Sequence, residues 1–488
     1  MPEKQQNNSL VNILSWAANQ AEMRKRVFIT IGALVLLRLV FLLPLPGLDL
    51  EALKKFLGMI SNDQAGRVIM LVFGGSLDRF TIFGLGLMPF FSSCILIQLA
   101  SVAIPKLRRL SFGGEGGRRE ISKYTYIITI VLSLLQSYFI GLWIENPARF
   151  EGMRLVAMAP GLGFRLTCMA TMTAAVMLLL FFADLITRHG IGNGIALIAV
   201  SFIPLKLFAA ARQLLNLGQN GELPFSPVVF AVVFAGFIYV IYFITNRSKQ
   251  IEFQDEKSNK ISLNLRPTIT GYAPISFAQS VILFPAVLAS LTGARNMYNL
   301  LMRGNLLYFL AYFILIAVFT YLYAAIIFSP KYILNTAAKY GYKLVKNNGR
   351  SEEEYLDLGM LKVLIMSALF LIGIACIPDI TAVFFRIPYL VAGFLGGTAI
   401  ALAVGVFSDI IRQLEFFRDK DISGIKNWKI CYTAFDEIEA GLKSAFLNNK
   451  GVPALVEPLR FSWGMPERTM VDQYRIYVPE ERKGEAGE

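Results

Sequence analysis

Ten long apolar stretches recur along this chain of 488 residues. A helix needs about 20 mostly apolar residues to cross the roughly 30 Å hydrocarbon core of a bilayer. The chain is 55% hydrophobic and only 17% charged, which excludes a soluble globular domain and a disordered chain. The sequence therefore predicts an all-α polytopic membrane protein. The expected spans are 27–45, 80–104, 122–144, 165–187, 193–213, 226–245, 269–291, 305–329, 359–378 and 389–411.

Positive charge is unevenly divided between the segments that join these spans. If the N-terminal segment lies inside, the inside segments carry 21 Lys and Arg and the outside segments carry nine. Basic segments remain on the cytoplasmic side of a membrane, so we expect both termini in the cytoplasm. The net charge of +13 then indicates contact with anionic lipid or a docking surface for a cytosolic partner. The inside segments are 1–26, 105–123, 188–192, 246–267 and 330–358.

The chain offers few groups for catalysis or metal binding. His189 is the only histidine, and Cys94, Cys168, Cys376 and Cys431 have no metal-like spacing. No P-loop, Rossmann, GxSxG or HExxH motif occurs in a fitting context. We therefore expect no enzymatic activity, no cofactor and no metal, and cysteines that serve as reduced packing residues.

Two spans begin with the same unusual pattern. The second reads GLMP from Gly86 and the seventh reads GYAP from Gly271, and each is the second span of a set of five. Matching interrupted helices indicate two internal repeats with the functional path at their interface. Because five is odd, the two halves, 27–213 and 226–411, must have opposite orientations. Proline frees backbone groups that lipid cannot satisfy, so both prolines are expected inside the bundle, unless each simply kinks a helix for packing.

A short apolar run precedes the second span and is too brief to cross a bilayer. It ends at a glycine pair, which gives the backbone freedom to hinge. The run is either an ordinary extracellular amphipathic turn or a movable element. Its residues are Val68, Ile69, Met70, Leu71, Val72, Phe73, Gly74 and Gly75.

Two other classes of membrane protein are alternatives to a channel. A secondary transporter for a small solute also uses inverted repeats and broken helices, but its ionisable ligands should lie near the centre of spans 2 and 7. The sequence has none there. A scaffold or insertase without a pore would need neither the short apolar run nor the paired Gly-x-x-Pro spans.

Six motifs in order give the chain a resemblance to the SecY family, the central subunit of bacterial protein-conducting channels, over about residues 9–420. The motifs are RLVFLLPLPG (38–47), SLDRFTIFGLGLMPFFSSCILIQL (76–99), GEGGRREISKYT (114–125), RHGIGNGIALI (188–198), GYAPISFAQSVILFPA (271–286) and GGTAIALAVGVFSDIIRQLE (396–415). The resemblance implies two inverted five-helix halves around a central hourglass pore. Unfolded secretory polypeptides with a signal sequence would cross this pore, and residues 64–77 would fold into it as a plug.

The resemblance also implies an apolar ring at the narrowest part of the pore and a lateral gate toward lipid. A ring of apolar side chains can seal around varying cargo and exclude ions. Its members would be Leu87, Phe91, Val281 and Leu402, with span 5 contributing Ile195 or Ile198; Ser276 stands where the family usually has a ring isoleucine. The gate, through which apolar cargo segments would enter lipid, maps to Ser92, Gln98, Thr268, Ser276 and Gln279.

Partners follow from the same resemblance. The chain would assemble with the small membrane subunits SecE and SecG in the bacterial cytoplasmic (inner) membrane. Its cytoplasmic loops would dock the motor ATPase SecA and the ribosome, and nucleic acid would be met only through the ribosome. The docking residues would be Arg247, Lys249, Arg266, Lys346 and Arg350, where Lys346-Asn-Asn-Gly-Arg350 replaces the Arg-Pro-Gly expected at the tip of the second loop.

The C-terminal tail after Glu415 is longer than the resemblance accounts for. Residues 412–488 contain no apolar stretch long enough to span a membrane. The tail is compatible with helix up to about Asn449, and beyond it prolines and charges predict an irregular segment.

Overall fold

The chain forms two compact units in the computed structural model. The first unit combines residues 1–28, 189–278 and 313–488, and the second combines 29–188 and 279–312. The structure describes residues 10–49, 81–112, 114–145, 158–219, 227–247, 249–255, 260–265, 271–272, 274–275, 277–279, 281–282, 306–327, 330–345, 349, 351–384, 387, 392, 396–425, 427–434, 437–458 and 474–485.

Helices of the second unit pack closely through small side chains. Thr125, Thr129, Ser133 and Ser137 lie four residues apart on one face of α7, and all four are buried. Each hydroxyl donates to the carbonyl four residues earlier, which satisfies it within the helix. This stripe lets α5 approach α7, where the hydroxyls of Ser93 and Thr129 lie 2.6 Å apart. The helices of this unit are α5 (Met88–Ala103), α6 (Pro105–Phe112), α7 (Gly114–Glu145) and α8 (Leu162–His189), together with most of α2 (Ala21–Val40).

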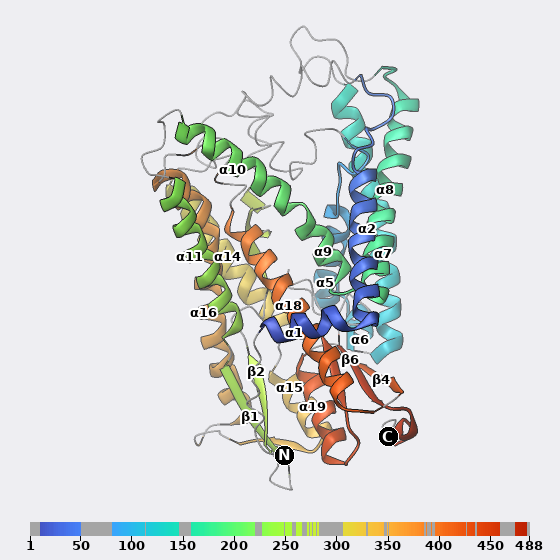
Figure 1. Cartoon of the computed structure of the whole chain (residues 1–488), viewed down its shortest axis with the longest axis vertical. Coiled ribbons are helices and arrows are strands. Elements are labelled where there is room, and N and C mark those ends of the chain that lie inside the picture. Colours follow the sequence, from blue (N-terminus) through green and yellow to red (C-terminus); the bar gives the residue numbers. More distant parts are fainter. Residues whose placement is uncertain are drawn as a thin grey trace. The chain divides into compact units, whose positions relative to one another are not determined.

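Helices of the first unit are arranged around α18. This helix contacts α1, α9, α11 and α16 (Figure 1). Gly397 at its start lies against α16 so closely that an added Cβ would stand 2.2 Å from the carbonyl oxygen of Ile374. Only glycine permits this approach. The helices are α1 (Leu10–Asn19), α9 (Gly194–Ser201), α10 (Ile203–Gln219), α11 (Pro227–Asn246), α15 (Pro330–Lys339), α16 (Glu352–Phe384), α18 (Gly397–Ile422) and α19 (Glu437–Asn449); α14 (Leu306–Ile327) continues from the second unit into the first.

The described helices confirm only some of the expected membrane spans. Among the described residues, three helical segments are long and apolar enough to cross a membrane: Arg119–Leu142, Leu162–His189 and Glu352–Phe384. Shorter apolar helices cover Met88–Ile97, Val232–Thr245 and Leu306–Leu322. The count of ten spans therefore stays a prediction. One expected span, 193–213, is divided into α9 and α10 around Phe202, because Pro204 in the first turn of α10 cannot donate a backbone hydrogen bond.

Two small antiparallel sheets, both in the first unit, complete the described part of the chain. The first has the order β2-β1-β3, from β1 (Lys249–Asp255), β2 (Lys260–Leu265) and β3 (Tyr342–Leu344). This first sheet joins the two expected cytoplasmic loops, because β1 and β2 lie in 246–267 and β3 lies in 330–358. The second has the order β4-β6-β5, from β4 (Trp428–Ala434), β5 (Leu455–Pro458) and β6 (Tyr474–Pro479), and the short helix η4 (Glu480–Arg482) follows it.

The second sheet corrects the prediction of an irregular tail beyond Asn449. The side chains of Tyr474, Ile476 and Val478 alternate along β6 and are buried. This period of two is typical of a strand with one face in a core. Pro458 and Pro479 are the last residues of β5 and β6, where a proline can end a strand without disrupting it.

Candidate functional site

The two repeated helices begin in the same way. Gly86 has φ +53° and Gly271 has φ +60°, both in the left-handed region that favours glycine. Pro89 is the second residue of α5, and Pro274 has helical backbone two residues after the bend at Tyr272. Proline is tolerated in the first turn because its missing N–H has no partner there. The prolines therefore begin these helices instead of kinking them, and the internal repeat extends from sequence to backbone conformation.

Three residues of the expected ring lie in the second unit. Leu87 is the residue before α5, Phe91 lies in the first turn of that helix, and both are buried. The left-handed turn at Gly86 positions them, because it sets the direction in which α5 starts. Val281 has helical backbone and is 46% exposed.

The other ring residues lie in the first unit on two helices that contact each other. Ile195 and Ile198 are buried on α9, and Leu402 is buried on α18. Asn193 caps α9, because its side-chain oxygen accepts hydrogen bonds from the backbone N–H groups of Ile195 and Ala196 at 3.1 and 3.3 Å. The cap fixes where the helix that carries both isoleucines begins.

The other expected site residues are only partly described. Ser92 and Gln98 lie on α5, and Gln279 lies in the helical stretch 277–279. Arg247 is exposed after the last residue of α11, with its guanidinium carbon 4.4 Å from the ring centroid of Phe243, and Lys249 begins β1. The plug residues 64–77 and Thr268, Ser276, Arg266, Lys346 and Arg350 lie outside the described residues.

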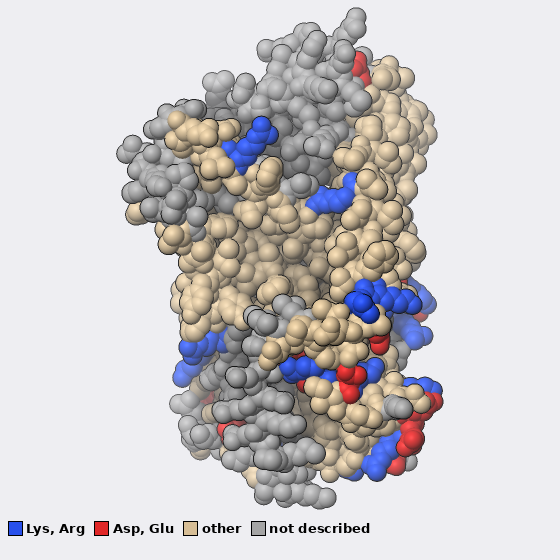
Figure 2. All heavy atoms as spheres, in the orientation of Figure 1, with Lys and Arg blue, Asp and Glu red and all other residues tan. Residues whose placement is uncertain are grey.

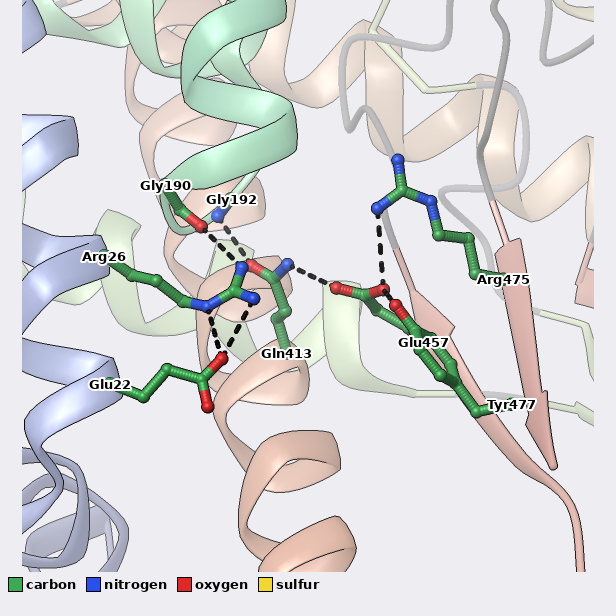
Figure 3. Close-up of polar contacts among 8 residues, drawn as sticks. All are labelled: Glu22, Arg26, Gly190, Gly192, Gln413, Glu457, Arg475 and Tyr477. Carbon is green, nitrogen blue, oxygen red and sulfur yellow. Dashed lines mark hydrogen bonds and ion pairs between the residues drawn. The ribbon is translucent and has the colours of Figure 1, made fainter. Parts of the chain in front are cut away.

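The turn that precedes α9 is held by a group of polar contacts that the sequence did not reveal (Figure 3). Gly192 donates its backbone N–H to Oε1 of Gln413 at 2.6 Å. Arg26 donates to the carbonyl oxygen of Gly190 at 3.4 Å and binds Glu22 at 3.1 Å. The guanidinium carbon of Arg26 lies 4.7 Å from the ring centroid of Phe417. Residues from α2 and α18 thus hold the same turn from two elements.

A buried carboxylate of the tail continues this group. Glu457 of β5 is 2% exposed and accepts from Gln413 Nε2 at 3.2 Å and from the hydroxyl of Tyr477 at 2.8 Å. Arg475 Nη1 lies 3.8 Å from the same carboxylate. A buried carboxylate is stable only when such partners replace water. Burial, together with the nearby carboxylate, raises the pKa of Tyr477, so its hydroxyl stays protonated and donates.

Charged side chains gather over the tail elements of the first unit. Figure 2 shows them near β4, β6 and α1, whereas the visible face of α11 is apolar. Lys429 pairs with Glu480 across the edge of the second sheet, and Lys420 lies 4.8 Å from the ring of Tyr477. Burial lowers the pKa of Lys420. The tail surface is mixed in charge, so it does not by itself indicate binding to nucleic acid.

Comparison with known proteins decides the family. A family model described as SecY matches residues 81–411. The protein translocase subunit SecY of Escherichia coli K12 is 31% identical over 416 residues, which cover 81% of this chain and 91% of that protein. The chain belongs to the SecY family. The SecY subunits of Aquifex aeolicus (32% identity, 81% of this chain and 94% of the relative) and Thermotoga maritima (31%, 81% and 92%) are similarly related.

Solved structures agree with this assignment at the level of the fold. A structure described as that of a protein conducting channel matches with a TM-score of 0.51 at 13% identity, over 84% of this chain and 97% of the other. A study of the SecY plug domain provides a second match, with a TM-score of 0.52 at 14% identity and the same coverage. The chain therefore shares the fold of these two structures, as the resemblance to the SecY family implied.

Membership of the SecY family also decides between the classes of function. The chain is a protein-conducting channel subunit, not an enzyme. Nothing in the comparisons supports the alternative of a small-solute transporter. As a translocase subunit it works within a larger assembly in a membrane.

Proposed function

We propose that the apolar ring seals the pore of this SecY-family channel. The ring residues are Leu87, Phe91, Val281 and Leu402, with Ile195 or Ile198 from span 5. The observation that carries the proposal is the matched pair of helix starts at Gly86 and Gly271. Equivalent breaks in two repeats are the places where such proteins form a path.

The chemistry of the cargo explains why apolar side chains suit this role. A translocating polypeptide presents no fixed side chain, so a specific binding site would serve no purpose. Apolar side chains of differing size can close around any residue and keep a resting pore dry, because water leaves a narrow apolar constriction. Burial of Leu87, Phe91, Ile195, Ile198 and Leu402 supports the proposal, since a closed ring would exclude solvent from these members, whereas Val281 is 46% exposed and does not add to this support.

A gate between spans 2 and 7 would release apolar cargo segments into the lipid. Its residues are Ser92, Gln98, Thr268, Ser276 and Gln279. Small polar side chains across such a seam contribute about 0.6 kcal/mol per hydrogen bond. Burial of cargo surface in lipid yields about 25 cal/mol per Å². A side chain of ordinary size therefore outweighs several gate contacts, and cargo can open the gate.

The plug and the docking surface complete the proposed cycle. Residues 64–77 would close the outer vestibule at rest and swing away at Gly74-Gly75. The basic residues Arg247, Lys249, Arg266, Lys346 and Arg350 would dock SecA or the ribosome on the cytoplasmic face. SecE and SecG would accompany the chain in the bacterial inner membrane, with both termini in the cytoplasm. The excess of Lys and Arg in the inside segments supports this orientation.

Resting conductance tests the proposed seal. Replacing Leu87, Phe91 and Leu402 together by Gly should raise the ion conductance of purified channel in planar bilayers. A matched control replaces Leu135, Phe139 and Leu166, which are exposed apolar residues of α7 and α8, by Gly. The control should leave conductance unchanged. Wild-type conductance in the first variant would mean that these side chains pack elsewhere and that the ring lies at other positions.

A further inference from the structure

We infer that the C-terminal tail sets the position of the pore helix α9, with Gln413 and Glu457 as positioning residues that act through the turn at Gly192. This inference rests on the proposed role of Ile195 and Ile198 in the seal. Gln413 lies in the last family motif, 396–415, but neither the motifs nor the matched family region, which ends at residue 411, give a role to the tail beyond Glu415.

Gln413 is the link between the tail and the turn. It is 2% exposed on α18, and its amide uses both ends: Oε1 accepts from Gly192 N–H at 2.6 Å and Nε2 donates to Glu457 at 3.2 Å. A buried amide can be oriented only if its donor end and its acceptor end both find partners. Glu457, which accepts but cannot donate when ionised, therefore determines that the oxygen of Gln413 points to the turn (Figure 3).

Glu457 is itself held in place by the tail sheet. Tyr477 of β6 donates to its carboxylate at 2.8 Å, and Arg475 of the same strand lies within 3.8 Å. The two strands are paired in register, with Glu457 opposite Arg475. The orientation of the carboxylate is therefore fixed by the fold of the tail.

The turn at Gly192, which joins Gln413 to α9, is tightly packed. Gly192 has φ +82°, and a Cβ there would stand 3.1 Å from Leu197 of α9 and 3.3 Å from Ile410 of α18. Asn193, the next residue, caps α9. A displacement of the Gly192 N–H would therefore move the cap and the first turn of the helix, where Ile195 lies.

An apolar core reinforces the same connection. The side chain of Ile191 is buried with Leu414 and Phe417 of α18, and Leu455 of β5 and Tyr477 of β6 pack against this cluster. The turn, α18 and the tail sheet thus share one core as well as one chain of hydrogen bonds. Such a core keeps water away from the polar contacts, which strengthens them.

Swapping the side chains of Gln413 and Glu457 provides the sharpest test. Gln413→Glu alone keeps an acceptor for Gly192 but places two carboxylates in contact. The double variant Gln413→Glu/Glu457→Gln restores one donor and one acceptor with the total charge unchanged. The full chain, purified in detergent micelles, is compared by hydrogen–deuterium exchange over residues 190–198. Resting conductance is then measured in planar bilayers.

The expected results follow from the loss of one buried hydrogen bond. Gln413→Glu should speed amide hydrogen–deuterium exchange over 190–198 by about tenfold and raise resting conductance. The double variant should return both quantities to within about twofold of wild type. Exchange and conductance unchanged in Gln413→Glu, or no rescue by the double variant, would overturn the inference. Glu481→Gln, an exposed carboxylate after β6, is the control and should change neither quantity.

A second pair of variants separates positioning from general stability. Glu457→Ala should speed exchange over 190–198 in the wild-type background but have no further effect in a Gln413→Leu background, because the tail acts through Gln413. Additive effects would overturn the inference, since they would mean that the tail only stabilises the whole unit. Faster exchange with unchanged conductance would support the positioning and would instead contradict the proposed role of Ile195 and Ile198 in the seal.

Discussion

Asn449 of α19 donates a hydrogen bond from its side-chain amide to the hydroxyl of Tyr342 in β3, at 2.8 Å. This contact joins the end of a tail helix to the expected second docking loop. The same two elements share a core, in which Leu442 of α19 packs with Tyr342 and with Phe253 of β1. The tail therefore helps to hold together segments 246–267 and 330–358, the two expected cytoplasmic loops, which the sequence treated as separate.

Removing the tail's contribution to this core should loosen both loops. Leu442 is fully buried, so Leu442→Ala should destabilise the cytoplasmic part by about 2–5 kcal/mol. Trypsin should then cleave the loops 246–267 and 330–358 faster, as peptide mapping would reveal. Ile422→Ala, at an aliphatic residue 64% exposed at the end of α18, is the control and should leave cleavage unchanged. Equal cleavage in both variants would refute a bracing role for α19.

The left-handed turn at Gly86 should resist substitution for backbone reasons alone. An added Cβ there meets no atom within 4 Å, so only the positive φ opposes it. Gly86→Ala should cost about 1–2 kcal/mol and lower the thermal midpoint, whereas Gly86→Asn should lose less, because asparagine tolerates this conformation better. Gly236→Ala in α11, where an added Cβ is also unopposed, should not lower it. Equal midpoints for Gly86→Ala and Gly236→Ala would contradict the expectation.

The sequence revealed the parts of the fold that depend on local pattern. The helices α7, α8 and α16 follow from long apolar stretches, and the motif GxxP located two equivalent helix starts, although it did not reveal that the prolines begin the helices. The split at Phe202 was missed because the apolar stretch continues through Pro204 without interruption. The strand β6 was missed because charges at its end masked the alternation of Tyr474, Ile476 and Val478.

The polar contacts at the turn before α9 could not be predicted from the sequence. Gln413 and Glu457 are 44 residues apart, and Gln413 and Gly192 are 221 apart. No spacing rule joins residues at such separations, and a lone Gln in a helix or a lone Glu in a tail is ordinary. The only local signal was the glycine-rich sequence GIGNG at 190–194, which indicates a turn but not what binds it.

Docking on the cytoplasmic face should depend on several charges together. Each exposed ion pair contributes on the order of 0–1 kcal/mol, so reversing Lys346 or Arg350 alone should weaken SecA binding only modestly. Reversing Arg247, Lys249, Lys346 and Arg350 together should do far more, and the affinity of the wild type should fall as salt rises. Binding of SecA to reconstituted channel across a salt series measures this. Loss of binding from one substitution would show a single dominant residue, and no effect of four would show that docking uses another surface.

A covalent lock on the plug should stop transport. In a chain whose native cysteines have been replaced by Ser, Leu71→Cys and Ile195→Cys should form a disulfide when oxidised, and export of a signal-bearing precursor should stop. Reduction should restore export, because the segment can again swing at Gly74-Gly75. The single Leu71→Cys variant, oxidised in the same way, is the control. Undiminished export with a verified cross-link would rule out the plug assignment.

Photo-cross-linking of a stalled polypeptide tests most directly whether cargo passes through the proposed ring. A photoreactive residue is placed at Leu87, Ile195 or Leu402 in turn, and at the exposed Leu135 as a control, in channels that hold a precursor arrested in transit. The ring positions should each cross-link to the arrested chain and Leu135 should not. Cross-links absent from all three ring positions while the precursor remains arrested would contradict the account, because the polypeptide would then cross by another path.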